Sequence, residues 1–169
     1  MGLKEDHERA VGNKFIAWYN KLHGTSFEFD HVPAQAPDLV FKDGPKEISI
    51  EIVTAYYDGA DATALWTAAR KKPQPAEWAG LGPDAKLIAG INSSISAKCA
   101  KQYAPGTTLI VHVRPSLTTW LDFKGREGEV RTPTGESNPF KAIYLSGDFP
   151  ASRDEPQGYH CTLLYSRSS

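Results

Sequence analysis

The sequence has few of the features that mark secreted, membrane-spanning or disulfide-stabilised proteins. Its two cysteines, Cys99 and Cys161, form no Cys-x-x-Cys pair, so we expect two reduced, partly buried thiols. The longest apolar run, Phe15 to Tyr19, is far shorter than the ~20 residues needed to cross a bilayer. The first residues are charged and lack the apolar core of a signal peptide. These absences predict a cytoplasmic protein that does not have a membrane as a partner.

A large excess of charge of either sign is also missing. Lys and Arg number 19 and Asp and Glu number 20, which gives a formal net charge of −1. This balance argues against a polybasic protein that grips nucleic acid through bulk charge. The 40% hydrophobic content argues against an acidic disordered chain. With 169 residues, the sequence predicts a single domain over 1–169, with a core over about 3–115 and a C-terminal extension over about 116–169.

Several familiar catalytic motifs are absent as well. The sequence contains no GxGxxG, Walker A, GxSxG or HExxH motif. Its five histidines lack the spacing of metal ligands: His7, His23, His31, His112 and His160. An unrelated α/β enzyme acting on a small molecule therefore stays open only as an alternative without a motif to support it.

The apolar pattern predicts an α/β (α+β) fold, in which helices cover a mixed sheet. Val11, Phe15, Trp18 and Leu22 recur at helical spacing, and Gly24 follows as a stop signal. Further helices are expected over 61–72 and 84–103, and strands over 27–32, 38–41, 47–53, 107–113, 142–145 and 159–165. The order is a helix, three strands, a helix and a strand, followed by a β-rich tail, which is typical of neither a helix bundle nor a regular βαβ array.

Two acids occupy unexpected places in the hairpin around Asp43-Gly44. A tight loop there pairs residue 41 with 46 and residue 39 with 48, and opposite side chains share a face. The apolar face then holds Leu39, Phe41, Ile48, Ile50 and Ile52, and the other face holds Asp38, Val40, Ser49, Glu51 and Val53. On an exposed face, Asp38 and Glu51 are ordinary surface acids. Under a helix, the pair needs a proton or a hard cation such as Mg²⁺ or Mn²⁺.

The helices add polar side chains on their buried faces. Glu8 lies along the apolar stripe of the first helix, seven residues before Phe15. On the second convincing helix, Lys98 and Gln102 fall on the face that Ile91 and Ile95 define. Each has an ordinary structural explanation by itself, but together with the strand acids they indicate a site.

This arrangement resembles the PD-(D/E)xK nuclease superfamily. Its signature is a Pro-Asp followed by an acid-x-Lys on the next strand, and Pro37-Asp38 and Glu51-Ile52-Val53 are similar. Glu8 matches a first-helix Glu of many members, and Gln102-Tyr103 is similar to a second-helix pair of some. The motif lysine is replaced by Val53. The superfamily lets this lysine migrate to another element, and Lys98 is the candidate. The resemblance implies a restriction-endonuclease-like αβββαβ core.

The resemblance also implies hydrolysis of DNA or RNA, with DNA favoured, by a metal-activated water. Asp38 and Glu51 would bind Mg²⁺ (or Mn²⁺), with the Ile52 backbone carbonyl and Glu8 as further ligands. Lys98 would orient the water or neutralise the scissile phosphate, and Gln102 would complete the catalytic set.

Basic residues near the site are expected to contact nucleic acid, and Arg70-Lys71-Lys72 is the candidate patch. The chain is expected to act as a homodimer or beside a partner subunit. With Val53 at the lysine position, the alternative is a catalytically degenerate nuclease fold that serves as a nucleic-acid- or protein-binding module.

Overall fold

The computed structural model describes residues 2–55, 82–114, 118–153 and 155–168, and every structural statement below concerns these ranges. The helix expected over 61–72 and the basic patch Arg70-Lys71-Lys72 lie outside them.

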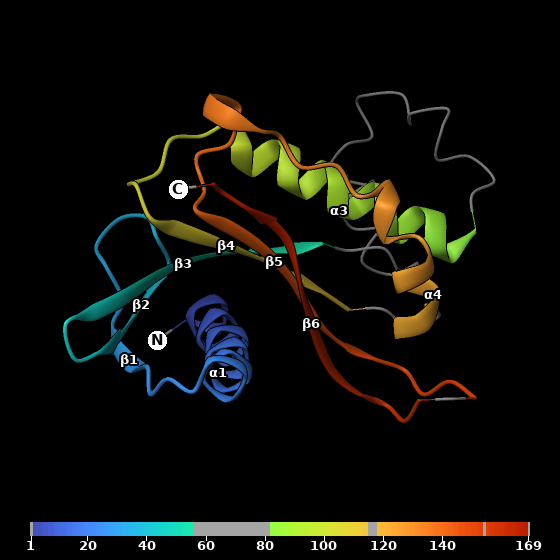
Figure 1. The fold of residues 1–169 in the computed structure, drawn as a ribbon, viewed down its shortest axis with the longest axis horizontal. Helices are drawn as coiled ribbons and strands as arrows, with labels where there is room; N and C mark the ends of the chain where they lie inside the picture. The colour runs from blue at the N-terminus through green and yellow to red at the C-terminus, as the bar shows by residue number, and fades with distance from the viewer. Residues whose placement is uncertain (1, 56–81, 115–117, 154, 169) are drawn as a thin grey trace.

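A six-stranded mixed sheet forms the centre of the molecule, with the strands in sequence order from β1 to β6 (Figure 1). The first three strands form an antiparallel meander, β3, β4 and β5 run parallel, and β6 returns antiparallel. The strands are β1 (Glu28–His31), β2 (Leu39–Asp43), β3 (Lys46–Ala55), β4 (Thr107–Val113), β5 (Ala142–Phe149) and β6 (Gly158–Ser166).

Two long helices cover the opposite faces of this sheet (Figure 1). Helix α1 (Leu3–His23) packs Val11, Phe15 and Ile16 on Leu39, Phe41, Ile50, Ile52 and Ile110. Helix α3 (Pro83–Cys99) packs Leu87, Ile91 and Ile95 on the other face, against Leu109, Val111, Ile143 and Leu145. Since both faces of β4 are covered, all seven of its residues are buried, including the polar Thr107, Thr108 and His112.

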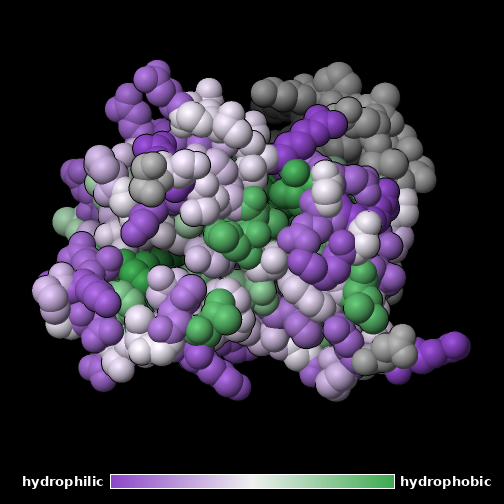
Figure 2. All heavy atoms as spheres, viewed as in Figure 1, coloured by the Kyte–Doolittle hydropathy of each residue, from purple (hydrophilic) through white to green (hydrophobic). Residues whose placement is uncertain are grey.

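Smaller elements complete the second face. Helix α4 (Trp120–Gly125) and the 3₁₀ turns η2 (Glu127–Glu129) and η3 (Gly135–Ser137) link β4 to β5. The sequence pattern predicted only irregular structure over 125–139 and no helix at 120–125, because such short elements carry too few apolar repeats to show a period. On the face shown in Figure 2, hydrophobic residues form small separate patches among hydrophilic ones.

The predicted α/β class and the order helix, three strands, helix, strand are confirmed for the described elements. The predicted hairpin register is wrong by two residues: Phe41 pairs with Ile48 and Leu39 with Ile50. The strands extend to Asp43 and Lys46, and Gly44 takes the positive φ of 59° that the two-residue turn requires. Because side chains alternate with a period of two, this shift leaves the predicted faces intact.

The helix predicted over 84–103 ends earlier, at Cys99. Both cysteines are free and partly buried, as expected. None of the described helices combines the length and the apolar character needed to cross a membrane.

Candidate active site

Asp38 and Glu51 meet at the point where β2 begins beside β3. Leu39 pairs with Ile50, so the next step of the same register sets Asp38 opposite Glu51. Asp38 Oδ2 accepts a 2.8 Å hydrogen bond from the backbone N–H of Ile52. This bond fixes the carboxylate of Asp38 beside the middle of β3. Asp38 and Glu51 therefore lie on one face of the hairpin, as predicted.

Glu51 is a buried carboxylate with a lysine partner. Its residue is only 6% exposed, and Lys98 Nζ of α3 donates to its Oε1 at 2.7 Å. The hydroxyl of Tyr103 donates to the same oxygen at 3.4 Å. The second oxygen, Oε2, is buried and has no hydrogen-bond partner among the described residues. Lys98 therefore reaches Glu51 from the facing helix, as its helical spacing predicted.

The acids and the lysine perturb one another's ionisation. Burial raises the pKa of Asp38 to about 6, the charges of Glu51 and Glu8 add to the rise, and the Ile52 N–H and Lys98 oppose it. For Lys98, burial acts to lower the pKa, but the hydrogen bond and the charge of Glu51 outweigh burial and raise it. Asp38 is thus a carboxyl that changes charge near neutral pH, beside a lysine that remains protonated.

The backbone of Ile52 offers a further oxygen at this place. In a strand, the N–H and the C=O of one residue point to the same side. Since the Ile52 N–H is directed at Asp38, its carbonyl points to the same open side, beyond the first residue of β2. The site therefore combines two carboxylates and one backbone carbonyl, all of them oxygen donors.

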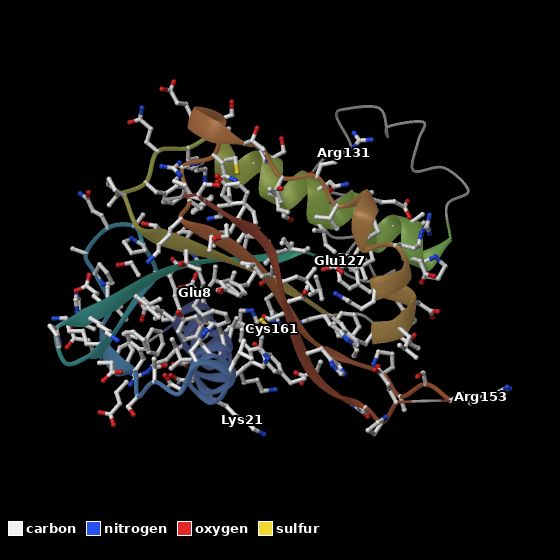
Figure 3. All side chains as sticks on the ribbon, viewed as in Figure 1. Glu8, Lys21, Glu127, Arg131, Arg153 and Cys161 are labelled. Atoms are coloured by element: carbon white, nitrogen blue, oxygen red, sulfur yellow. The ribbon has the colours of Figure 1, made fainter. Side chains whose placement is uncertain are left out.

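Glu8 lies on the sheet-facing side of α1 (Figure 3). Its side chain is 13% exposed and pairs with Lys4 at 3.4 Å, and its charge helps to raise the pKa of Asp38. Within the described ranges, no three His, Cys, Asp or Glu side chains are grouped closely enough to hold a metal ion. Glu8 is therefore a neighbour of the acid pair, and as placed it does not complete a three-carboxylate group.

The predicted placement of Gln102 on the buried face of the helix is wrong, because α3 ends at Cys99. After Cys99 the last turn tightens, and Lys101 N bonds to Lys98 O. Gln102 lies beyond α3 and is exposed. The next residue, Tyr103, points inward and contacts Glu51. In the sequence, Tyr103 stands out only as the residue that follows Gln102. The alternation of side chains in an extended segment is the signal that points to Tyr103 as the inward-facing residue.

Val53 occupies the position of the motif lysine and has a packing role. It is partly buried against the apolar cluster beneath α3. A lysine here would have to place its charge in that cluster, whereas Lys98 reaches Glu51 from α3 itself.

The residues fit a hard divalent cation. A buried carboxylate oxygen without a partner is costly, and so is a second carboxyl whose ionisation is opposed by burial and by like charge. A cation bound between Asp38 and Glu51 relieves both costs, and Mg²⁺ and Mn²⁺ prefer such oxygen ligands.

Comparisons with protein-family models, curated proteins and solved structures find no significant match to this chain.

Proposed function

We propose that the chain is a metal-dependent phosphodiesterase with a restriction-endonuclease-like fold that hydrolyses nucleic acid, with DNA as the favoured substrate. The observation that carries the proposal is the Asp38–Glu51 pair with Lys98 on Glu51 Oε1 and an unpartnered Oε2. The order of the elements supports the proposal, because it is an antiparallel meander followed by a crossover helix and a parallel strand. The acid pair lies where β2 and β3 of this meander meet.

Each residue has a distinct role in this proposal. Asp38, Glu51 and the Ile52 carbonyl hold Mg²⁺ or Mn²⁺, and the ion, when bound, makes water more acidic and stabilises charge on the phosphate. The Ile52 N–H keeps Asp38 in position through the 2.8 Å hydrogen bond. Lys98 supplies the positive charge for the scissile phosphate. Tyr103 holds Glu51 from the side of the chain that follows α3.

The experiment gives the purified full chain single- and double-stranded DNA and RNA with Mg²⁺ or Mn²⁺, beside Glu51→Gln. The variant keeps the shape of the side chain but removes a metal-binding charge, so cleavage is expected to fall by at least about 100-fold. Glu129→Gln is the matched control, since Glu129 is exposed and paired with Arg126 at 2.7 Å. Its cleavage rate should equal that of the unmodified chain.

Cleavage that survives in Glu51→Gln would show that the activity resides elsewhere. Binding of metal and nucleic acid by the unmodified chain without cleavage would instead favour the alternative of a degenerate nuclease fold that acts as a binding module, for which Val53 at the lysine position is the supporting observation.

A further inference from the structure

A second polar cluster lies at the carboxyl ends of the parallel strands, on the face that α1 covers. It comprises His7, Thr54, His112, Arg114 and Ser146, and we call it the edge cluster. His7 Nε2 of α1 is 3.2 Å from Thr54 Oγ1 at the end of β3. The rings of His7 and His112 are 5.7 Å apart, and His112 Nδ1 lies 3.4 Å from Ser146 Oγ. Ligands of open α/β sheets bind outside this end of the strands.

The hydrogen bonds fix which groups of the edge cluster can donate outward. Arg114 Nη2 lies 3.4 Å from His7 Nδ1, and because a guanidinium only donates, Nδ1 must accept. Burial, followed by the charge of Arg114, lowers the pKa of His7, and in the neutral ring with Nδ1 as the acceptor the Nε2–H donates to Thr54 Oγ1. Among the described residues, the hydroxyl proton of Thr54 and the remaining N–H groups of Arg114 have no acceptor, which leaves them as donors. His7 thus holds the guanidinium in place without neutralising its charge.

Arg114 differs from its neighbours in its lack of an acidic partner. It is exposed, and within the described residues no carboxylate forms an ion pair with it. The acids that face the edge cluster are already paired, Glu8 with Lys4 at 3.4 Å and Asp148 with Lys14 at 2.8 Å. The edge cluster therefore presents one net positive charge together with a neutral hydroxyl donor, which is the chemistry that recognises a phosphate oxyanion.

We propose that Arg114 and Thr54, with His7 as a positioning residue, bind a phosphodiester of the nucleic-acid strand that enters the Asp38–Glu51 site. This inference rests on the proposed function. Thr54 lies three residues after Glu51, about 10 Å along β3, and faces α1, whereas Glu51 faces α3. The nucleic-acid strand would therefore pass the edge of β3 beyond Ile50, where β2 no longer pairs with it.

The test measures binding of fluorescein-labelled 20-nucleotide single strands and 20-base-pair duplexes by anisotropy, in EDTA so that metal-dependent cleavage does not interfere. Arg114→Gln is expected to weaken binding about tenfold and to lower the slope of log Kd against log salt by about one. His7→Leu should weaken binding less, since it frees the guanidinium without removing it. Arg126→Gln is the control, because Arg126 is already bound by Glu129. Its affinity and salt slope should be unchanged.

Equal binding by Arg114→Gln and the unmodified chain overturns the inference, and so does an absence of nucleic-acid binding by the unmodified chain. A parallel titration with inorganic phosphate, followed by the ring NMR signals of His7, separates the two sources of the ligand. Phosphate binding that depends on Arg114 without oligonucleotide binding overturns the nucleic-acid assignment. Arg114-dependent binding without cleavage leaves this site in place while the proposed hydrolysis fails. Cleavage that is unaffected by Arg114→Gln would leave the proposed hydrolysis in place while the proposed phosphate site fails.

Discussion

Two polar clusters interrupt the apolar packing of one strand, β3, and burial shifts the pKa values of their buried groups in opposite directions. The acid cluster (Asp38, Glu51, Lys98 and Tyr103) lies where β2 begins and faces α3. The edge cluster lies a few residues further along β3 and faces α1. Burial raises the pKa of Asp38 to about 6, while burial, followed by the charges of His7 and Arg114, lowers the pKa of His112 to about 4.

The difference shows how each cluster accommodates ionisable groups in a buried position. Glu51 is buried beneath α3 with Lys98 Nζ in direct contact at 2.7 Å. Within the described ranges, Asp38 and His112 have no oppositely charged group in contact, so burial favours the neutral form of each. Ionisation of Asp38 lowers stability as pH rises from about 4 to 6, and protonation of His112 lowers stability as pH falls from 6.5 to about 4. Between about pH 4 and pH 6.5, Asp38 therefore lowers stability towards the upper end and His112 lowers it towards the lower end.

The largest expected effect comes from removing the partner of Glu51. Lys98→Met keeps the length of the side chain but leaves a buried carboxylate unpaired, and the free energy of unfolding at pH 7 should fall by about 3–5 kcal/mol. Chemical denaturation measures this. Arg126→Gln breaks an exposed pair and should cost far less, because solvent screens that pair. Equal losses in the two variants would contradict the buried character of the Glu51–Lys98 pair.

The edge cluster should dominate stability at low pH. The depressed pKa of His112 implies that the chain loses about 3 kcal/mol between pH 7 and pH 4 through this one group. In His112→Asn that loss should disappear, so the curve of unfolding free energy against pH should flatten in this range. Denaturation at several pH values tests the slope, which does not depend on any constant packing loss of the variant. An unchanged slope would show that His112 is protonated without cost.

Metal binding should change the acid cluster and leave the edge cluster unaffected. At 100 times its dissociation constant, Mg²⁺ or Mn²⁺ should stabilise the chain by about 2.7 kcal/mol, seen as a rise in Tm. The rise should shrink below pH 6, because protons compete for Asp38. Glu51→Gln should abolish the rise, while His112→Asn should retain it. A rise of equal size in Glu51→Gln would place the metal elsewhere.

The sequence predicted the faces of the hairpin better than its register. The expected pairing of residue 41 with 46 is wrong, yet Asp38 and Glu51 still share one face, because an error of two residues preserves alternation. The same error hid how close the acids are. In the true register Asp38 stands opposite Glu51, whereas the predicted register set it opposite Ser49.

Helical spacing correctly placed Lys98 but failed at Gln102, four residues later. The spacing holds while the chain stays helical, so Lys98 meets Glu51 and Gln102, after the end of α3, does not. The edge cluster had almost no local signal in the sequence. His7 and His112 are far apart in sequence and meet only because α1 crosses the carboxyl ends of parallel strands. A polar residue near the end of a buried strand, such as His112 in TTLIVHV, was the one available indication.

The smallest expected effect completes the contrast between the clusters. Asp38→Asn removes a carboxyl that is costly to ionise, while the Asn side-chain oxygen still accepts the Ile52 N–H. Because the folded pKa is raised, the gain should be absent near pH 4 and present above pH 6. Solvent screening at this partly exposed site limits it to about 1 kcal/mol. Denaturation in EDTA at pH 4 and pH 8 measures the difference. A gain at pH 8 together with lost metal stabilisation would show that Asp38 is retained at the expense of stability, as expected for a metal ligand. A loss at pH 8 would show that its charge stabilises the fold.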